Sequence, residues 1–211
     1  MNCPLCNKNH IHHYLSDLRR DYFKCENCAL VFVPPEQRPS CVEEKRRYDE
    51  HQNNPDDPGY RKFLSRIFYP IRERVSPPAR GLDFGSGIGP TLSVMFEESG
   101  YDMVIYDKFY ADNPSVLTGK YDFITCTEVV EHLFNPLSEI KRLTSMLKPD
   151  GLLGIMTKLV IDRQAFSKWH YKNDFTHVCF FSMKTFQWLA ANLKCELEFI
   201  GKDVILLVPV H

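Results

Sequence analysis

The sequence lacks the features that mark a secreted, membrane-spanning or strongly nucleic-acid-binding protein. Its 211 residues carry 26 Lys and Arg against 27 Asp and Glu, with no polybasic run. The composition therefore gives no support for tight, non-specific binding to nucleic acid. No basic segment followed by an apolar stretch opens the chain, so we expect no secretory signal. The longest apolar run, residues 204–210, is far too short to span a bilayer, and we expect a cytoplasmic protein with no membrane partner.

Internal repeats and low-complexity tracts are also missing, and the length suits one α/β domain with a small appendage. Three segments differ in composition. Residues 1–34 are rich in Cys and His, residues 35–79 are polar and punctuated by proline, and residues 80–211 alternate strand and helix patterns. We expect a small metal-binding knuckle, a helical linker or lid, and a main domain. Apolar residues at helical spacing in GYRKFLSRIFYPIRERV motivate the prediction that residues 35–76 close over the substrate crevice.

Four of the eight cysteines form two CxxC pairs, separated as CxxC-x18-CxxC. Each pair makes a tight turn that presents two thiolates, and four thiolates complete a tetrahedral site. We therefore predict a structural zinc ion and assign no chemistry to it. The predicted zinc ligands are Cys3, Cys6, Cys25 and Cys28. Four other cysteines have no paired spacing and are expected to be buried or incidental, namely Cys41, Cys126, Cys179 and Cys195.

Three glycines alternate in GLDFGSGIGP, after an apolar strand pattern and before a helix pattern. Gly85, Gly87 and Gly89 have GxGxG spacing, which differs from the GxGxxG of dinucleotide sites. A turn without Cβ atoms lets the backbone pass close to a bound nucleoside. Asp107 ends the next apolar run, where a carboxylate can accept hydrogen bonds from both ribose hydroxyls. An ordinary tight turn is the alternative, and Asp107 favours the nucleoside site.

The regular alternation after residue 80 predicts a mostly parallel sheet with crossover helices. Residues 137–151 read as an amphipathic helix that ends at the Pro149–Gly151 segment. Ser182 is the expected N-cap of a later helix, and residues 196–210 read as a closing hairpin around Gly201 and Lys202.

The segment TCTEVVEHLFNP contains a Glu-x-x-Glu-His pattern. If it starts a helix, its carboxylates and imidazole share one face and can hold a divalent ion. A later cluster, WHYKNDFTHVCFFS, follows another strand, and loops at the carboxyl ends of strands line the ligand crevice. Metal binding and general-base catalysis by a histidine both stay open. The catalytic candidates are Glu128, Glu131, His132 and His177. Four neighbours are expected to be solvated loop residues, namely His170, Tyr171, Lys172 and Asp174.

The LDFGSGIG segment and its acidic partner resemble the class I methyltransferases, which use S-adenosylmethionine, over about residues 80–210. The resemblance implies a Rossmann-like sheet with a closing β-hairpin. Residues 108–120 leave little room before the next strand, so the third strand is expected to be reduced or absent. The cofactor-binding residues it implies are Asp83 near the methionine part, Gly85, Gly87 and Gly89 under the adenosine, Asp107 on the ribose, and Glu128.

The Glu-x-x-Glu-His pattern is similar to that of metal-dependent O-methyltransferases of ubiquinone biosynthesis and of plant small-RNA ends, in which the metal binds substrate hydroxyls. The RNA enzymes add a later histidine resembling the one in THVCFFS. Three segments, YFKCENCALVFVPPEQ, RRYDEHQNN and WHYKNDFTHVCFFS, resemble a bacterial family of zinc-ribbon methyltransferases over nearly the whole chain. That family has no firm substrate.

These resemblances imply an enzyme that moves a methyl group from S-adenosylmethionine to an oxygen or carbon of a small molecule. Two alternatives stay open: an RNA methyltransferase whose ribbon docks RNA, and a non-catalytic zinc-ribbon binding protein with a methyltransferase-like fold. The balanced charge and the absence of a basic and aromatic stripe count against the first alternative. The intact glycine turn and Asp107 count against the second. The sequence predicts no oligomeric state.

Overall fold

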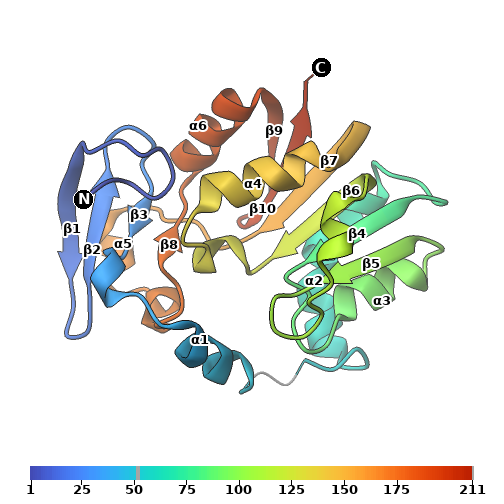
Figure 1. Cartoon of the computed structure of the whole chain (residues 1–211), viewed down its shortest axis with the longest axis horizontal. Coiled ribbons are helices and arrows are strands. Elements are labelled where there is room, and N and C mark those ends of the chain that lie inside the picture. The colour runs from blue at the N-terminus through green and yellow to red at the C-terminus, as the bar shows by residue number, and fades with distance from the viewer. Residues whose placement is uncertain (51–52, 211) are drawn as a thin grey trace.

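A computed structural model describes residues 1–50 and 53–210, whose strands form a six-stranded sheet and a four-stranded sheet beside it (Figure 1). The first four strands of the large sheet run parallel, and the last two form an antiparallel hairpin. This arrangement confirms the expected Rossmann-like sheet with a closing hairpin. In spatial order the strands are β5 (Asp102–Tyr106), β4 (Arg80–Phe84), β6 (Tyr121–Thr127), β7 (Leu147–Met156), β10 (Val204–Pro209) and β9 (Cys195–Ile200).

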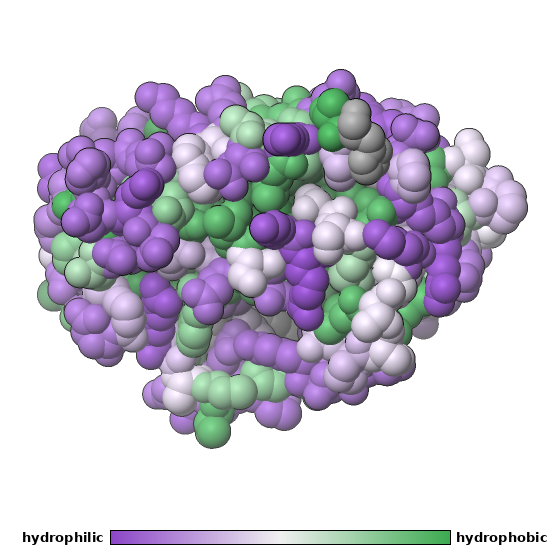
Figure 2. Space-filling view, turned by 45° about the horizontal axis from the view of Figure 1, so that its top comes forward, coloured by the Kyte–Doolittle hydropathy of each residue, from purple (hydrophilic) through white to green (hydrophobic). Residues whose placement is uncertain are grey.

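Helices cover both faces of the large sheet, and each face has its own hydrophobic core. Strand β7 contributes side chains to both cores. Leu153 and Ile155 pack in the core with α4 and α6. Leu152 and Met156 pack in the core with α2 and α3 on the opposite face. Within the described residues, no helix has the length and apolar character needed to cross a bilayer. Hydrophilic residues cover most of the face in Figure 2, and hydrophobic ones show near its centre. The helices are α2 (Pro58–Arg72), α3 (Thr91–Glu97), α4 (Pro136–Ser145) and α6 (Met183–Leu193).

Helix α6 begins as its sequence predicts. Ser182 is the N-cap, and its side chain accepts a hydrogen bond from the backbone N–H of Thr185. The Thr185 hydroxyl in turn accepts from the Ser182 N–H, which completes a capping box.

The predicted helix at residues 137–151 is wrong in its second half. Helix α4 ends at Ser145, and β7 begins two residues later, so the Pro149–Gly151 segment lies inside a strand. The reason is non-local, since Leu147 pairs with Tyr121 of β6 and takes the start of β7 into the sheet. The third strand is absent from the described residues between β5 and β6, as the short connection predicts. That connection contains the 3₁₀ helix η2 (Pro114–Thr118) and a single bridge between Asp107 and Ala111.

The N-terminal segment forms the small sheet together with a strand from the far end of the chain. The sheet therefore crosses the predicted boundary after residue 34, because Val31 pairs with Phe180 and Phe32 with Cys179. Helix α5 lies beside this sheet (Figure 1). The elements are β1 (Ile11–Ser16), β2 (Asp21–Cys25), β3 (Val31–Phe32), β8 (Cys179–Phe180) and α5 (Arg163–Ser167).

Residues 35–79 divide into two parts with different roles. After the 3₁₀ helix η1 (Pro35–Gln37), helix α1 (Cys41–Tyr48) lies at the carboxyl edge of the large sheet (Figure 1). Helix α2 instead packs on the sheet, where a Cβ on Gly154 would lie 2.9 Å from Cδ1 of Ile71. Most of α2 is therefore part of the core, although Tyr60 and Phe63 in its first turns line the same pocket as α1. Residues 51 and 52, which connect the two parts, lie outside the described residues.

We expect Ile67→Ala to reduce the free energy of unfolding by about 2–5 kcal/mol, because it opens a cavity where α2 meets the sheet. Ile67 is fully buried. Lys62→Ala, on an exposed position of the same helix, is the matched control and should change stability by less than about 0.5 kcal/mol. Urea unfolding followed by circular dichroism measures both. Equal effects from the two variants would contradict the assignment of α2 to the core.

Candidate functional site

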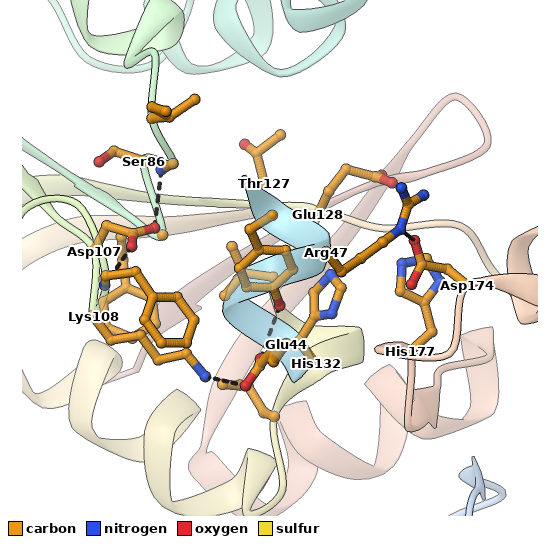
Figure 3. A pocket seen from close by; sticks show the side chains of 18 of the residues that line it. Glu44, Arg47, Ser86, Asp107, Lys108, Thr127, Glu128, His132, Asp174 and His177 are labelled. Atoms are coloured by element: carbon orange, nitrogen blue, oxygen red, sulfur yellow. Dashed lines mark hydrogen bonds and ion pairs between the residues drawn. The ribbon is translucent and has the colours of Figure 1, made fainter. Parts of the chain in front are cut away.

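A pocket of about 1380 Å³ opens at the carboxyl ends of the parallel strands. It exceeds the roughly 300–1,000 Å³ of ordinary small-molecule sites, so its volume is large enough for two ligands. Figure 3 shows Ser86 and Asp107 at one end of the pocket and His177 and Asp174 at the other, with His132 between them.

The glycine turn forms one end of the pocket. Gly85 has a φ of +79°, and a Cβ there would lie 2.3 Å from Val129, so this position admits only glycine without rearrangement. Gly87, with a φ of +67°, donates its N–H to Asp107 across 3.0 Å. Asp107 also accepts from the N–H of Phe109 at 2.8 Å, which fixes its carboxylate at the end of β5.

Two predicted cofactor residues lie behind the turn instead of lining the pocket. Asp83 is 4% exposed and accepts a hydrogen bond from the Thr125 hydroxyl at 2.7 Å. Burial raises the pKa of Asp83 to about 6. Gly89 faces the chain at Asn53, whose carbonyl oxygen would lie 2.2 Å from a Cβ on Gly89. Both residues therefore bear on the shape of the turn.

The Glu-x-x-Glu-His segment does not form the helix that its spacing suggested. Glu128 has a φ of +54°, and only one 3₁₀ turn, η3 (Val130–His132), follows it. The structure nevertheless brings three of the four catalytic candidates together. One possible ligand atom from each of Glu131, His132 and His177 lies within 4.8 Å of the others, and Glu128 is not part of this group. Glu131 and His132 therefore meet His177 through the tertiary fold, and the shared helical face that the sequence suggested does not form.

Both histidines are oriented by backbone carbonyls. His132 Nδ1 lies 3.1 Å from the carbonyl oxygen of Thr176, and His177 Nδ1 lies 2.7 Å from that of Tyr171. Because a carbonyl only accepts, each Nδ1 carries the hydrogen and each Nε2 keeps a free lone pair. Burial, followed by the neighbouring His177, lowers the pKa of His132, and burial lowers the pKa of His177 to about 4. Such neutral rings with a bonded Nδ1 are the usual form of metal-binding histidines.

The carboxylate of Glu131 is fully buried between two hydroxyl donors. Thr157 donates to one oxygen at 3.0 Å, and Tyr171 donates to the other. Burial, and after it the Glu128 carboxylate, raises the pKa of Glu131. Within the described residues, Oε1 of Glu128 is buried without a hydrogen-bond partner. The site thus holds two acidic groups and two neutral imidazoles, a set that suits a divalent cation.

Helix α1 spans the pocket between its two ends. Glu44 is paired with Lys108 at 2.6 Å beside the Asp107 end, and Arg47 donates to Asp174 at 2.9 Å beside the His177 end (Figure 3). Tyr48 lies between these pairs, with its ring centroid 5.2 Å from that of His132. Sequence reasoning missed these side chains, because only the general prediction of a lid pointed to this helix.

The loop at residues 169–178 differs from its prediction. Tyr171 and Lys172 are 6% and 5% exposed, so the expectation of solvated side chains is wrong for these two residues. Tyr171 is held by Glu131 and Lys172 by Asp17, at 2.7 Å. The partners come from distant parts of the chain, which explains why the polar character of the loop suggested exposure. The loop includes the 3₁₀ helix η4 (His170–Asn173).

The four predicted zinc ligands converge on two turns of the same geometry. In each turn the residue after the second cysteine, Asn7 or Ala29, has a φ near +57°, and its N–H donates to the carbonyl of the first cysteine. The Sγ atoms of Cys3 and Cys28 lie 3.5 Å apart, and those of Cys6 and Cys25 lie 3.4 Å apart. Sulfurs about 3.8 Å apart surround a tetrahedral zinc, whereas disulfide sulfurs are about 2 Å apart. The sulfur geometry therefore suits a zinc ion.

A family model described as a methyltransferase domain matches residues 48–198. The chain belongs to this methyltransferase family. The match begins within α1 and ends in β9, so it includes the glycine turn, the histidine group and the loop between β7 and α6.

Two curated proteins resemble parts of the methyltransferase. The ubiquinone biosynthesis O-methyltransferase of Glaesserella parasuis is 42% identical over 57 residues, which is 27% of this chain and 24% of the relative. The protein of the same description from Actinobacillus pleuropneumoniae is 38% identical over 65 residues, 29% of this chain and 28% of the relative. The chain thus matches about a quarter of the length of these relatives.

Solved structures share the fold at low sequence identity. Magnesium protoporphyrin IX methyltransferase from Synechocystis, solved with bound SAH, aligns with a TM-score of 0.54 at 13% identity. The alignment covers 80% of this chain and 94% of that protein. An O-methyltransferase family protein from Burkholderia thailandensis aligns with a TM-score of 0.50 at 14% identity, covering 82% of this chain and 64% of that protein.

We expect elemental analysis of the purified methyltransferase to find about one zinc per chain at the Cys3–Cys6 and Cys25–Cys28 turns. Cys25→Ser should lose this zinc, because three thiolates no longer close the site. Cys41→Ser, at an exposed cysteine outside the group, is the control and should retain it. A folded protein without zinc, or a disulfide between Cys3 and Cys6, would show that the prediction is wrong.

Proposed function

We propose that the protein transfers the methyl group of S-adenosylmethionine to an oxygen or carbon nucleophile of a small-molecule acceptor, and that an oxygen nucleophile suits the site best. One observation carries the proposal. A single pocket is lined by the glycine turn and Asp107 at one end and by His132 and His177 at the other, with Glu131 buried behind the histidines, so a cofactor and an acceptor can lie end to end. The ubiquinone biosynthesis O-methyltransferases among the relatives give independent support for an oxygen acceptor.

The residues at the glycine turn suit the cofactor. Gly85 and Gly87 line the pocket with positive φ angles that favour glycine, and Asp107 offers carboxylate oxygens to ribose hydroxyls at the end of β5. When bound, the cofactor supplies an activated methyl group, so the protein has to align the reactants and remove one proton. In this proposal Asp83 and Gly89 maintain the turn from behind.

The histidine end suits an acceptor hydroxyl. His132 and His177 each keep an Nε2 lone pair free, and one possible ligand atom of each ring lies within 4.8 Å of one from Glu131. A divalent ion held by these three side chains would bind the hydroxyl oxygen and favour loss of its proton. Without an ion, the lone pair of either histidine would accept the proton directly. Glu128 borders the pocket with an unbonded oxygen and is proposed to face the bound ligands.

Helix α1 is proposed to keep the reactants in place and to exclude water. Its ion pairs with Lys108 and Asp174 attach it to both ends of the pocket, and Tyr48 covers His132. Closure of this kind holds the nucleophile in line with the methyl group and protects the reaction from solvent. The lid function is therefore proposed for residues 41–50 and 53, whereas α2 supports the sheet.

We expect Asp107→Ala to weaken binding of S-adenosylmethionine by about 1.5–3 kcal/mol, the range for hydrogen bonds to a charged group. Calorimetry with the cofactor or its demethylated product measures the effect. Asp112→Ala is the control, because Asp112 is exposed on the same loop and does not line the pocket. Unchanged affinity in the Asp107 variant would place the ribose elsewhere.

We expect His132→Ala and His177→Ala to bind the cofactor normally and to lose turnover by roughly 10²–10⁴-fold, the usual contribution of general acid–base groups. Candidate phenol, sugar and RNA acceptors would be screened with labelled cofactor. His12→Ala, on the exposed surface of β1, serves as the control. We call residues 1–34, which hold the four clustered cysteines, the N-terminal ribbon. Loss of turnover with a chelator that leaves the zinc of this ribbon in place would show that catalysis needs a second metal ion. Wild-type turnover in both variants would exclude the histidines as catalytic residues.

A further inference from the structure

A single arginine of the N-terminal hairpin is enclosed by the loop that carries His177. Arg20 lies in the turn between β1 and β2, yet it is only 7% exposed. Its guanidinium Nη1 donates to the carbonyl oxygens of Phe175 at 2.9 Å and His177 at 2.8 Å. Its Nη2 donates to those of Asp174, at 3.0 Å, and Lys172. Four carbonyls of one loop thus converge on one side chain.

This arrangement requires arginine. A guanidinium presents several N–H groups in a rigid planar fork and stays charged, whereas the ammonium of lysine cannot reach four spread carbonyls at once. The Lys172 carbonyl also accepts from the Tyr22 hydroxyl, and the Asp174 carbonyl from the N–H of His177. Buried carbonyls without donors are costly, so removal of the fork leaves the other two carbonyls, those of residues 175 and 177, to find new partners. The loop between Lys172 and His177 therefore has its conformation set by a residue that precedes it by about 150 positions.

The loop that encloses Arg20 also orients the two histidines. Thr176 supplies the carbonyl that binds Nδ1 of His132, and Tyr171 supplies the carbonyl that binds Nδ1 of His177. The four carbonyls bound by Arg20 belong to residues 172, 174, 175 and 177, and three of these residues are next to Tyr171 or Thr176 in the chain. A shift of the loop would move both orienting carbonyls and so change the orientation of both rings within the group that they form with Glu131.

Other contacts tie the hairpin to the same region. Asp17 is paired with Lys172 at 2.7 Å, and the hydroxyl of Tyr22 donates to the Lys172 carbonyl at 3.3 Å. Strand β2 runs from the residue after Arg20 to Cys25, one of the four clustered cysteines. The hairpin that the cysteine turns anchor is thus the same hairpin that holds the catalytic loop.

We infer that Arg20 is a positioning residue for the methyl-transfer site: its guanidinium holds the 172–177 loop so that His132 and His177 keep their Nδ1–H bonds and stay grouped with Glu131 with Nε2 unprotonated. The role of the N-terminal ribbon is then to complete the active site. This inference rests on the proposed function, because the orientation of the histidines matters for catalysis only if this pocket transfers methyl groups.

The test reads the ring nitrogens and needs neither cofactor nor acceptor. Zinc-loaded protein labelled with ¹⁵N-histidine is examined by NMR, and His177→Gln assigns the His177 ring signals. The wild type should show His177 as one neutral form with hydrogen on Nδ1. Arg20→Met keeps the apolar stem but removes the donors, and it should show the other tautomer or exchange between the two. Arg163→Gln is the matched control, since Arg163 links α5 to the ribbon through the Tyr14 carbonyl and does not contact the loop.

A second measurement links the orientation to ligand binding. Cobalt(II) is titrated into the zinc-loaded wild type and variants, and its affinity for the second site should fall by about 10–100-fold in Arg20→Met, as for lost partners of metal-ligating histidines. Arg163→Gln should bind cobalt(II) as the wild type does. A wild type that does not bind cobalt(II) would count against the metal in the proposed function, and the ring signals would still decide the role of Arg20.

Zinc content separates positioning from simple folding of the ribbon. If Arg20→Met loses zinc, Arg20→Lys becomes the deciding variant, because it keeps the positive charge. It should retain zinc and still disturb the His177 tautomer. A zinc-retaining variant with wild-type His177 signals would overturn the inference. Loss of zinc in both variants would also overturn it, because Arg20 would then be required for the ribbon itself.

Discussion

Burial of both faces of the parallel strands is the constraint from which the site follows. Strand β7 sends alternate side chains into two separate cores, so its faces have no room for polar chemistry. Most polar groups of the site gather where the strands end, and there the chain places Asp107, His132 and the flanking loops. The carboxyl ends of neighbouring parallel strands meet at one edge, which brings the glycine turn and the two histidines into a single pocket.

That edge is completed by elements from outside the sheet. Helix α1 crosses it through charged contacts at both ends, and the N-terminal ribbon supports it through β3, β8 and Arg20. The hairpin formed by β1 and β2 therefore packs against the loop at residues 172–177. Its sheet crosses the chain boundary that composition suggested, because hydrogen bonding between β3 and β8 depends on the fold and leaves no mark in local composition.

Sequence reasoning was most reliable where the cause was local and failed where a distant segment decided. Ser182 caps α6 as predicted, since a capping box involves only neighbouring residues. The end of α4 was misplaced because Leu147 pairs with Tyr121, a contact with no local signal. Lys172 was expected in solvent, but Asp17 binds it from the opposite end of the chain. Partners separated by more than a hundred residues cannot be found by reading one loop.

By itself the sequence determined the alternating fold, the glycine turn with its acidic partner and the two CxxC turns, because each depends on spacing within a short segment. Only the tertiary structure decided which candidates meet. It grouped Glu131 and His132 with His177, which lies 45 positions after His132, and left Glu128 outside that group. It also enclosed Arg20 in the loop at residues 172–177. The reason is that side-chain orientation at the edge of a sheet is set by contacts between segments, which no spacing rule encodes.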